Sequence, residues 1–252
     1  MKERIERFYE ACDKILAKEA IRERNGIGTL GEKTVHAVLK EYIEPRKEYQ
    51  EIKVGSFFAD ICNETGIYEI QTRSFRNLRK KLDYFLEIGP VTIVYPVPYI
   101  KQVRWLDEET GELSAGRKSP KKGSPYLILY ELYQIKEYLL NPRLSFKIIL
   151  MNMEETKLLN GWSYDRKRGA SRYDRIPTAL VEEVEIQNVK DFEKLIPESL
   201  TGEFTVKEFK KAAKLSDSAA SVGVNVLYYV GALERTGKKG NAYLYKKTEC
   251  RL

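Results

Sequence analysis

Two acidic residues, Asp60 and Glu69, occupy matching places in two short stretches whose composition is typical of β-strands. Asp60 lies within residues 57–62 and Glu69 within residues 67–72, and the turn-forming residues 63–66 separate the two stretches. If residues 63–66 form a four-residue hairpin loop, Asp60 and Glu69 stand opposite each other on one face, about 5 Å apart. Two like charges at that separation destabilise a hairpin, so we expect a neutralising group beside them.

The chemistry that this hairpin could support is that of a divalent metal ion. Side chains alternate along a strand, so Gln71 shares the face of Glu69. Two carboxylates and a polar amide suit Mg²⁺ or Mn²⁺, which polarises a phosphoryl oxygen and lowers the pKa of a bound water. The alternative is a solvent-facing hairpin whose acids are held apart by strand twist or offset by lysines such as Lys53. A shift of one residue in the register would also undo the pairing.

The elements that must position these residues alternate between helix and strand. Apolar residues at helical spacing predict an amphipathic helix over residues 1–24 and a second helix from about Thr29 to Pro45. Strands are predicted at 52–54, 57–62, 67–72, 91–95, 103–106 and 146–150, and helices from Ser74 to about Glu87 and from Ser124 to about Leu140. This order predicts an α/β fold.

Residues 29–97 resemble the core of the PD-(D/E)xK nuclease superfamily, which includes restriction endonucleases and Holliday-junction resolvases. The resemblance rests on the helix with Glu32, the hairpin with Asp60 and Glu69-Ile70-Gln71, and the helix and strand that follow. It implies a restriction-endonuclease-like mixed sheet flanked by helices. It also implies a catalytic centre of Asp60, Glu69, Gln71 and Glu32, with Asp60, Glu69 and Ile70 as metal ligands.

Two of these positions leave alternatives open. The superfamily's usual lysine position falls on Gln71, and a neutral amide cannot act as a base near pH 7, so we expect Gln71 to orient the attacking water. Glu32 would complete the water shell of the metal ion, or it is an acid favoured by the dipole at the start of its helix. His36, the one histidine in the sequence, is expected to pack rather than act as a base.

Basic residues outnumber acidic ones, 44 to 37, and the formal net charge of +7 is compatible with a polyanionic partner. Three basic runs, at 73–81, 117–122 and 165–175, supply most of the residues expected to contact nucleic acid, and glycine, proline or serine in the last two predicts loops. The expected set is Arg73, Arg76, Lys80, Arg117, Lys118, Lys121, Lys122, Arg166, Lys167, Arg168, Arg172, Lys238 and Lys239. Arg73 would hold the scissile phosphate. The alternative for each run is a solvated charged surface.

The C-terminal part of the chain predicts a winged-helix domain at 191–252, which follows a nuclease-like domain at 1–190. A capping-box pattern at residues 205–208 precedes one helix, Ser216 caps a second, and residues 233–246 predict a β-hairpin. The second helix is the one that usually enters the major groove, but it contains no lysine or arginine. DNA binding and protein contact therefore both stay open for this domain.

These features together predict a Mg²⁺- or Mn²⁺-dependent nuclease that hydrolyses phosphodiester bonds in DNA, either duplex or branched. The alternatives are a non-catalytic DNA-binding protein with a degenerate nuclease fold, which Gln71 favours, and an interaction protein that uses its winged helix. A homodimer would suit double-strand cutting. The sequence lacks a secretory segment and an apolar stretch long enough to span a membrane, so we expect a cytoplasmic protein with no membrane partner. Three cysteines without C-x-x-C spacing argue against disulfide bonds and a zinc site.

Overall fold

The computed structural model describes residues 2–24, 34–72, 74–107, 109–159 and 171–248, and no helix among them is long and apolar enough to cross a membrane. The chain divides into two compact units, each assembled from three segments. The first unit contains Met1–Gln50, Pro96–Gly123 and Ile149–Glu182, and the second contains Glu51–Tyr95, Ser124–Ile148 and Glu183–Leu252. The expected domain boundary near residue 190 stays a prediction.

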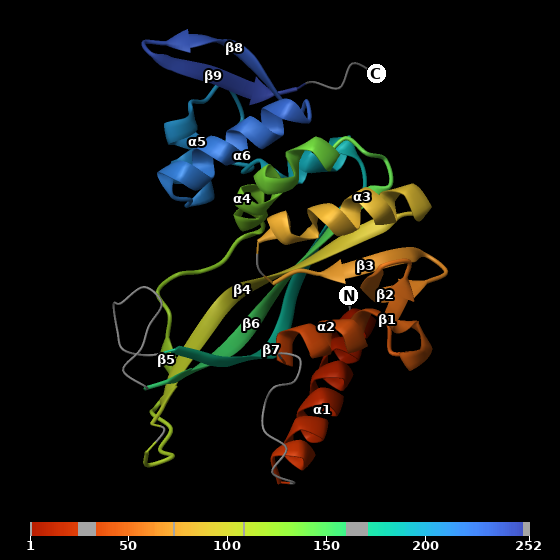
Figure 1. Cartoon of the computed structure of the whole chain (residues 1–252). Coiled ribbons are helices and arrows are strands. Elements are labelled where there is room, and N and C mark those ends of the chain that lie inside the picture. Colours follow the sequence, from red (N-terminus) through yellow and green to blue (C-terminus); the bar gives the residue numbers. More distant parts are fainter. Residues whose placement is uncertain (1, 25–33, 73, 108, 160–170, 249–252) are drawn as a thin grey trace. The chain divides into compact units, whose positions relative to one another are not determined.

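The described strands form a mixed β-sheet and a separate hairpin (Figure 1). The sheet contains β1 (Gln50–Val54), β2 (Phe57–Asn63), β3 (Gly66–Ile70), β4 (Val91–Leu106), β5 (Arg117–Lys118), β6 (Leu144–Leu158) and β7 (Ser171–Ile186). Their order is β1-β2-β3-β4-β6-β7, and β5 pairs with β4. β2 and β3 are antiparallel, whereas β3 and β4 are parallel because the helix α3 (Arg79–Ile88) connects them. The expectation of an α/β fold with a mixed sheet flanked by helices is confirmed.

Two predictions of loops were wrong in part, although residues 119–122 of the second basic run lie outside any strand or helix. The run at 165–175 lies partly in β7, which begins at Ser171, and Arg117 and Lys118 form β5 by pairing with Val103 and Gln102 of β4. In β7, Arg175 donates to the buried carboxylate of Glu155 at 2.8 Å. Charged residues can occupy a strand when partners on a neighbouring strand satisfy them, and such partners are not visible in the local sequence.

The first unit begins with two helices, α1 (Lys2–Arg24) and α2 (Thr34–Ile43). They pack through apolar side chains at the predicted spacing, and the rings of Phe8 and Tyr42 meet edge to face with centroids 5.5 Å apart. Buried Glu41 of α2 accepts hydrogen bonds from Lys14 and Lys47, each at 2.5 Å. A short helix, η1 (Lys47–Tyr49), leads into β1. The helix predicted from about Thr29 is confirmed over Thr34–Ile43. Its predicted first residues, 29–33, lie outside the described part of the chain.

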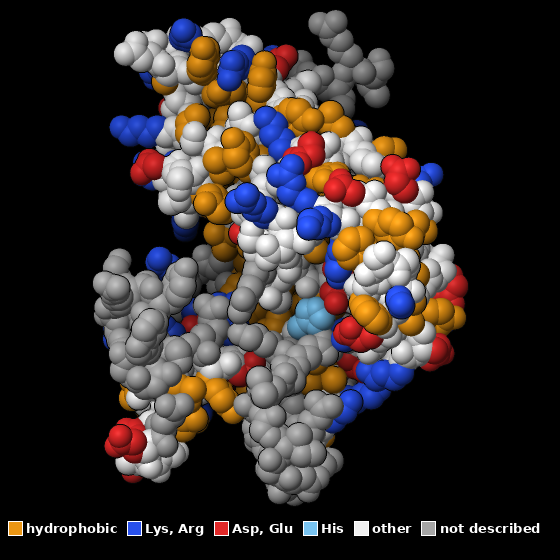
Figure 2. All heavy atoms as spheres, in the orientation of Figure 1, with side chains coloured by type: hydrophobic (Ala, Val, Ile, Leu, Met, Phe, Trp, Pro, Cys, Tyr) orange, Lys and Arg blue, Asp and Glu red, His pale blue; other side chains and the backbone are white. Residues whose placement is uncertain are grey.

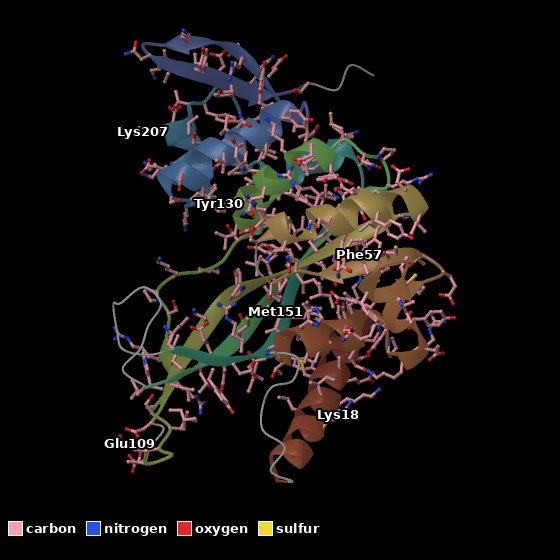
Figure 3. The ribbon with its side chains drawn as sticks, in the orientation of Figure 1. Lys18, Phe57, Glu109, Tyr130, Met151 and Lys207 are labelled. Carbon is pink, nitrogen blue, oxygen red and sulfur yellow. The ribbon has the colours of Figure 1, made fainter. Side chains whose placement is uncertain are left out.

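In the second unit, the helix predicted after Ser74 covers the strands that carry the acidic pair. It starts as a 3₁₀ turn, η2 (Phe75–Leu78), and continues as α3. The main-chain N–H of Arg76 donates a hydrogen bond to the side chain of Ser74, which caps the turn. Its inner side chains Leu82, Phe85 and Leu86 are buried, as the sequence predicts. Phe57 of β2 packs beside this helix, with ring centroids 5.9 Å from Tyr84 and 6.0 Å from Phe85 (Figure 3).

The single helix predicted from Ser124 to Leu140 is divided into three pieces. They are η3 (Pro125–Leu127), α4 (Ile128–Leu132) and η4 (Tyr133–Tyr138). Ile135 has non-helical backbone angles, φ −125° and ψ 30°, while its side chain is fully buried. The apolar periodicity therefore identified the buried face correctly but did not detect this interruption.

The C-terminal segment has the predicted order of helix, helix and hairpin. After η5 (Val189–Leu195) come α5 (Val206–Ala213), α6 (Asp217–Tyr229), β8 (Leu233–Lys239) and β9 (Ala242–Lys247). The capping box of Thr205 and Glu208 and the Ser216 cap are both formed. Phe204 forms a β-bridge with Tyr245, which ties the hairpin to the start of this segment.

Candidate functional site

The hairpin of β2 and β3 has the register that the sequence predicts. Ile61 pairs with Tyr68, Cys62 with Ile67, and Asn63 with Gly66. The loop is shorter than expected, because Asn63 and Gly66 still pair and only Glu64 and Thr65 remain between them. The next residue outward on each strand is Asp60 on β2 and Glu69 on β3, so the two acids lie on neighbouring strands at the same level.

A hydrogen bond anchors Asp60 to the strand that carries Glu69. The main-chain N–H of Ile70 donates to Oδ2 of Asp60 at 2.7 Å, and Asp60 is half-buried. The carboxylate is therefore positioned by backbone geometry. Ile70 has no polar side chain, so its carbonyl oxygen is the only atom that it could offer to a metal ion.

Glu69 is buried, with 3% of its surface exposed, and it forms an ion pair with Lys81 of α3. Nζ of Lys81 donates to both carboxylate oxygens of Glu69, at 2.8 and 3.0 Å, and to the carbonyl oxygen of Phe58 at 2.7 Å. A buried carboxylate requires such a partner because burial strongly disfavours an isolated charge. The neutralising group expected beside the acidic pair is therefore an ammonium from the covering helix, and not Lys53.

The pKa of Glu69 is raised to about 7, chiefly by burial and further by the negative charge of Asp60. Lys81 opposes both effects through its hydrogen bonds and its charge. A second cation close to this carboxylate would stabilise its ionised form further. The electrostatic environment of Glu69 thus favours the binding of positive charge.

Gln71 directly follows β3. Its main-chain N–H donates to the carbonyl oxygen of Val94 at 2.9 Å, which continues the parallel pairing with β4. Its side-chain Nε2 donates to the carbonyl oxygen of Ser74 at 2.8 Å. Oε1 is the only acceptor of the Gln71 side chain, so it is the atom that could accept a hydrogen bond from a water molecule.

The donor set matches the needs of Mg²⁺ or Mn²⁺. Among the described residues, no cluster of three or more His, Cys, Asp and Glu side chains could hold a metal ion. Mg²⁺ nevertheless binds proteins through one or two carboxylates and keeps its remaining positions for water and substrate phosphate. Asp60, Glu69 and the carbonyl oxygen of Ile70 could supply such a set if a metal ion displaced Lys81 from Glu69.

Other predicted site residues lie outside the described part of the chain or in the first unit. Glu32 and Arg73 lie outside the described residues, as do Arg166, Lys167 and Arg168. Arg172 belongs to β7. His36 is a half-buried residue of α2 in the first unit, which fits the packing role expected for it.

The remaining basic residues of the predicted nucleic-acid set are exposed. Arg76 and Lys80 belong to η2 and α3, next to the acidic hairpin, and Figure 2 shows Lys and Arg side chains over the start of α3, over α4 and over the C-terminal hairpin. Lys238 and Lys239 end β8. In the first unit, Arg117, Lys118, Lys121 and Lys122 lie in and just after β5, and Lys122 stacks on Tyr99 at 4.1 Å.

Lys81 is the residue of the site that the sequence interpretation missed. It belongs to the basic run at 73–81, whose composition does not distinguish it from its basic neighbours. The signal lay in its helical phase, because Lys81 is three residues after Leu78 and four before Phe85, both of which are buried. A lysine at this position borders the inner stripe and can reach across to the strands.

The fold and the site define an α/β mixed-sheet domain with a paired-carboxylate hairpin, and its sequence belongs to a family without an assigned role. Residues 33–187 match the family described as "Domain of unknown function (DUF8091)", so the chain is a member of that family. A protein of Treponema pallidum (strain Nichols), named "Uncharacterized protein", is 29% identical over 229 residues, which cover 88% of this chain and 87% of that protein. No solved structure matches the chain significantly. Asp60, Glu69, Gln71 and Lys81 all lie within the family match, whereas the segment from α5 to β9 lies beyond it.

Proposed function

We propose that this protein is a metal-dependent nuclease that hydrolyses phosphodiester bonds in DNA. The observation that carries the proposal is the anchored Asp60 beside the buried Glu69, with Lys81 donating to the Glu69 carboxylate. Two acids on neighbouring strands would hold Mg²⁺, which assists phosphodiester hydrolysis, and an adjacent lysine would add positive charge beside the phosphate. We further infer that the mixed sheet is of the restriction-endonuclease-like type and that the segment from α5 to β9 is a winged helix.

Each residue of the site has a distinct task in this proposal. Asp60, Glu69 and the Ile70 carbonyl oxygen would bind Mg²⁺ or Mn²⁺, which would polarise the scissile phosphate and lower the pKa of a bound water. Gln71 Oε1 would accept a hydrogen bond from the attacking water and so orient it. A metal ion bound to Glu69 would release Lys81 from its two hydrogen bonds to that carboxylate, and Lys81 would then donate to a phosphate oxygen as negative charge develops there. The lysine that the strand lacks at Gln71 would thus come from α3.

The test is cleavage of labelled duplex, nicked and branched DNA in Mg²⁺ or Mn²⁺ by the wild type and by Asp60→Asn, Glu69→Gln and Lys81→Met. Cleavage by the first two variants should fall to background, and Lys81→Met should lose on the order of 100-fold, as when one charge-stabilising donor is removed. Glu87→Gln, which alters an exposed acid on the same helix, is the matched control and should cut like the wild type. DNA binding in Ca²⁺ without any cutting in Mg²⁺ or Mn²⁺ would identify a non-catalytic DNA-binding protein instead.

A further inference from the structure

The C-terminal hairpin holds an arginine among three tyrosine rings. The guanidinium of Arg235 on β8 lies 4.3 Å from the ring centroid of Tyr243, 4.6 Å from that of Tyr228 and 5.7 Å from that of Tyr245. Nζ of Lys238 lies 4.9 Å from the ring of Tyr243. Cations at such distances from aromatic rings interact favourably with the π-electrons, so Arg235 and the three rings stabilise this arrangement.

Most of these aromatic groups remain accessible. Tyr228 is 41% exposed and Tyr243 is 43% exposed, and Arg235 is also exposed. Tyr245 is buried, and its ring meets the ring of Tyr228 edge to face. Rings that served only to complete the core would be covered to a greater extent. We call the surface of Tyr228, Arg235, Lys238 and Tyr243 the tyrosine platform.

The charge around the tyrosine platform is strongly positive. Residues 233–247 contain five basic residues and one acid, Glu234, and that acid is paired with Lys246 at 3.2 Å. By contrast, α6 contains no lysine or arginine and has Asp217 in its first turn. Between α6 and the hairpin, the groups that attract a polyanion are therefore on the hairpin, next to exposed rings, and not on the helix that reads duplex DNA in winged-helix proteins.

We propose that the tyrosine platform binds unpaired nucleotides of a single-stranded nucleic acid. Bases would stack on Tyr228, Tyr243 and the guanidinium plane of Arg235, and Lys238 would contact the phosphates. Exposed aromatic rings and adjacent cations are the combination that binds single strands, because every unpaired base offers a ring face and every linkage offers a phosphate. In a duplex the bases are already stacked on each other. The choice of DNA as the nucleic acid rests on the proposed function. The tyrosine platform would deepen that function by directing the protein to DNA with an unpaired segment.

The test is equilibrium binding of the full chain, in EDTA to prevent cleavage, to a fluorescent oligothymidylate of about 15 nucleotides. A duplex of equal length and an oligouridylate of equal length form the other arms. The single strand should bind more tightly than the duplex. Tyr228→Ala and Tyr243→Ala should each weaken single-strand binding by about 5- to 100-fold, the usual effect of losing one stacking ring, while Tyr243→Phe should keep most of the affinity.

The matched control is Tyr9→Ala, which removes a tyrosine of the same exposure, 43%, from α1 and should not change binding. Thermal melting should show that all variants are folded, since the replaced rings are exposed. The inference fails if both single strands bind no more tightly than the duplex, or if the two alanine variants bind like the wild type. Failure of the platform would leave cutting that depends on Asp60 intact, whereas failure of the nuclease proposal would leave single-strand binding intact.

Discussion

At the scale of single residues, the ion pair of Lys81 and Glu69 decides the charge balance of the site. The place of Glu69 opposite Asp60 could be predicted from the sequence, because it follows from strand alternation and a local turn. Both depend on a few neighbouring residues. Lys81 could not be selected in the same way. Five basic residues lie in the stretch from Arg73 to Lys81. Which of them reaches the acidic pair depends on how the helix is rotated relative to the sheet.

Replacing Lys81 by methionine should destabilise the protein, because Glu69 would remain buried without its partner. The free energy of unfolding should fall by about 2 kcal/mol near pH 8, less than for a fully buried pair because Lys81 is partly exposed. Urea unfolding would measure this. The double variant Lys81→Met with Glu69→Gln, which removes both charges, should recover most of the loss, and a single variant as stable as the wild type would show that the ion pair contributes little.

The pKa of Glu69 also predicts a pH dependence of stability. Its folded-state pKa of about 7 exceeds the ordinary value of 4.5, so its contribution to stability is fully present below pH 4.5 and is lost as the pH rises through 7. Glu69→Gln removes this titration. The variant should therefore gain stability relative to the wild type between pH 5 and pH 8, by on the order of 2 kcal/mol, in urea unfolding at a series of pH values. Parallel stability profiles for the two proteins would contradict the raised pKa.

At the scale of elements, local patterns identified most helices and strands of the fold. The hairpin, the helix after Ser74 and the capped helices α5 and α6 all have short-range signals, namely turn residues, caps and apolar periodicity. β7 has no such signal, since its charged residues are satisfied by partners such as Glu155 that lie far away in sequence. The interruption of η4 at Ile135 likewise has no local residue that marks it, and the Ile135 side chain is fully buried.

Gly66 is the element-scale feature that fixes the tight turn beside the site. Its φ is +130°, and a Cβ atom there would lie 2.6 Å from the carbonyl oxygen of Pro90, which is main chain and cannot move aside easily. Gly66→Ala should therefore lower the free energy of unfolding by about 2 kcal/mol and reduce cleavage by displacing β3. Gly202→Ala is the matched control, because a Cβ there meets nothing within 4 Å. Equal melting temperatures of the two variants would show that the turn tolerates a side chain.

At the scale of the whole molecule, the net charge of +7 predicts that the proposed DNA binding weakens as the salt concentration rises. Removing one phosphate-contacting lysine should reduce the slope of log affinity against log salt by about 1. The double variant Lys238→Ala, Lys239→Ala should thus reduce the slope by about 2. Binding titrations from low to physiological salt would measure it.

The matched control for this slope is Lys2→Ala with Lys18→Ala, which removes the same charge from exposed positions of α1. Its slope should equal that of the wild type. Equal reductions in both double variants would mean that only the overall charge matters, and that the hairpin holds no particular phosphates.

The division of the chain into two interleaved units has a consequence for its synthesis. The first unit needs residues up to Glu182, and the second needs residues beyond Glu183, although its hairpin of β2 and β3 is made much earlier. On the ribosome, more than half of the chain that follows α1 and α2 must therefore be synthesised before their unit is complete. The acidic hairpin and its helix α3, which are contiguous in sequence, emerge long before either unit can close. These segments therefore expose apolar surface until the later residues have been synthesised. Folding of the newly made chain should depend on synthesis of its C-terminal third.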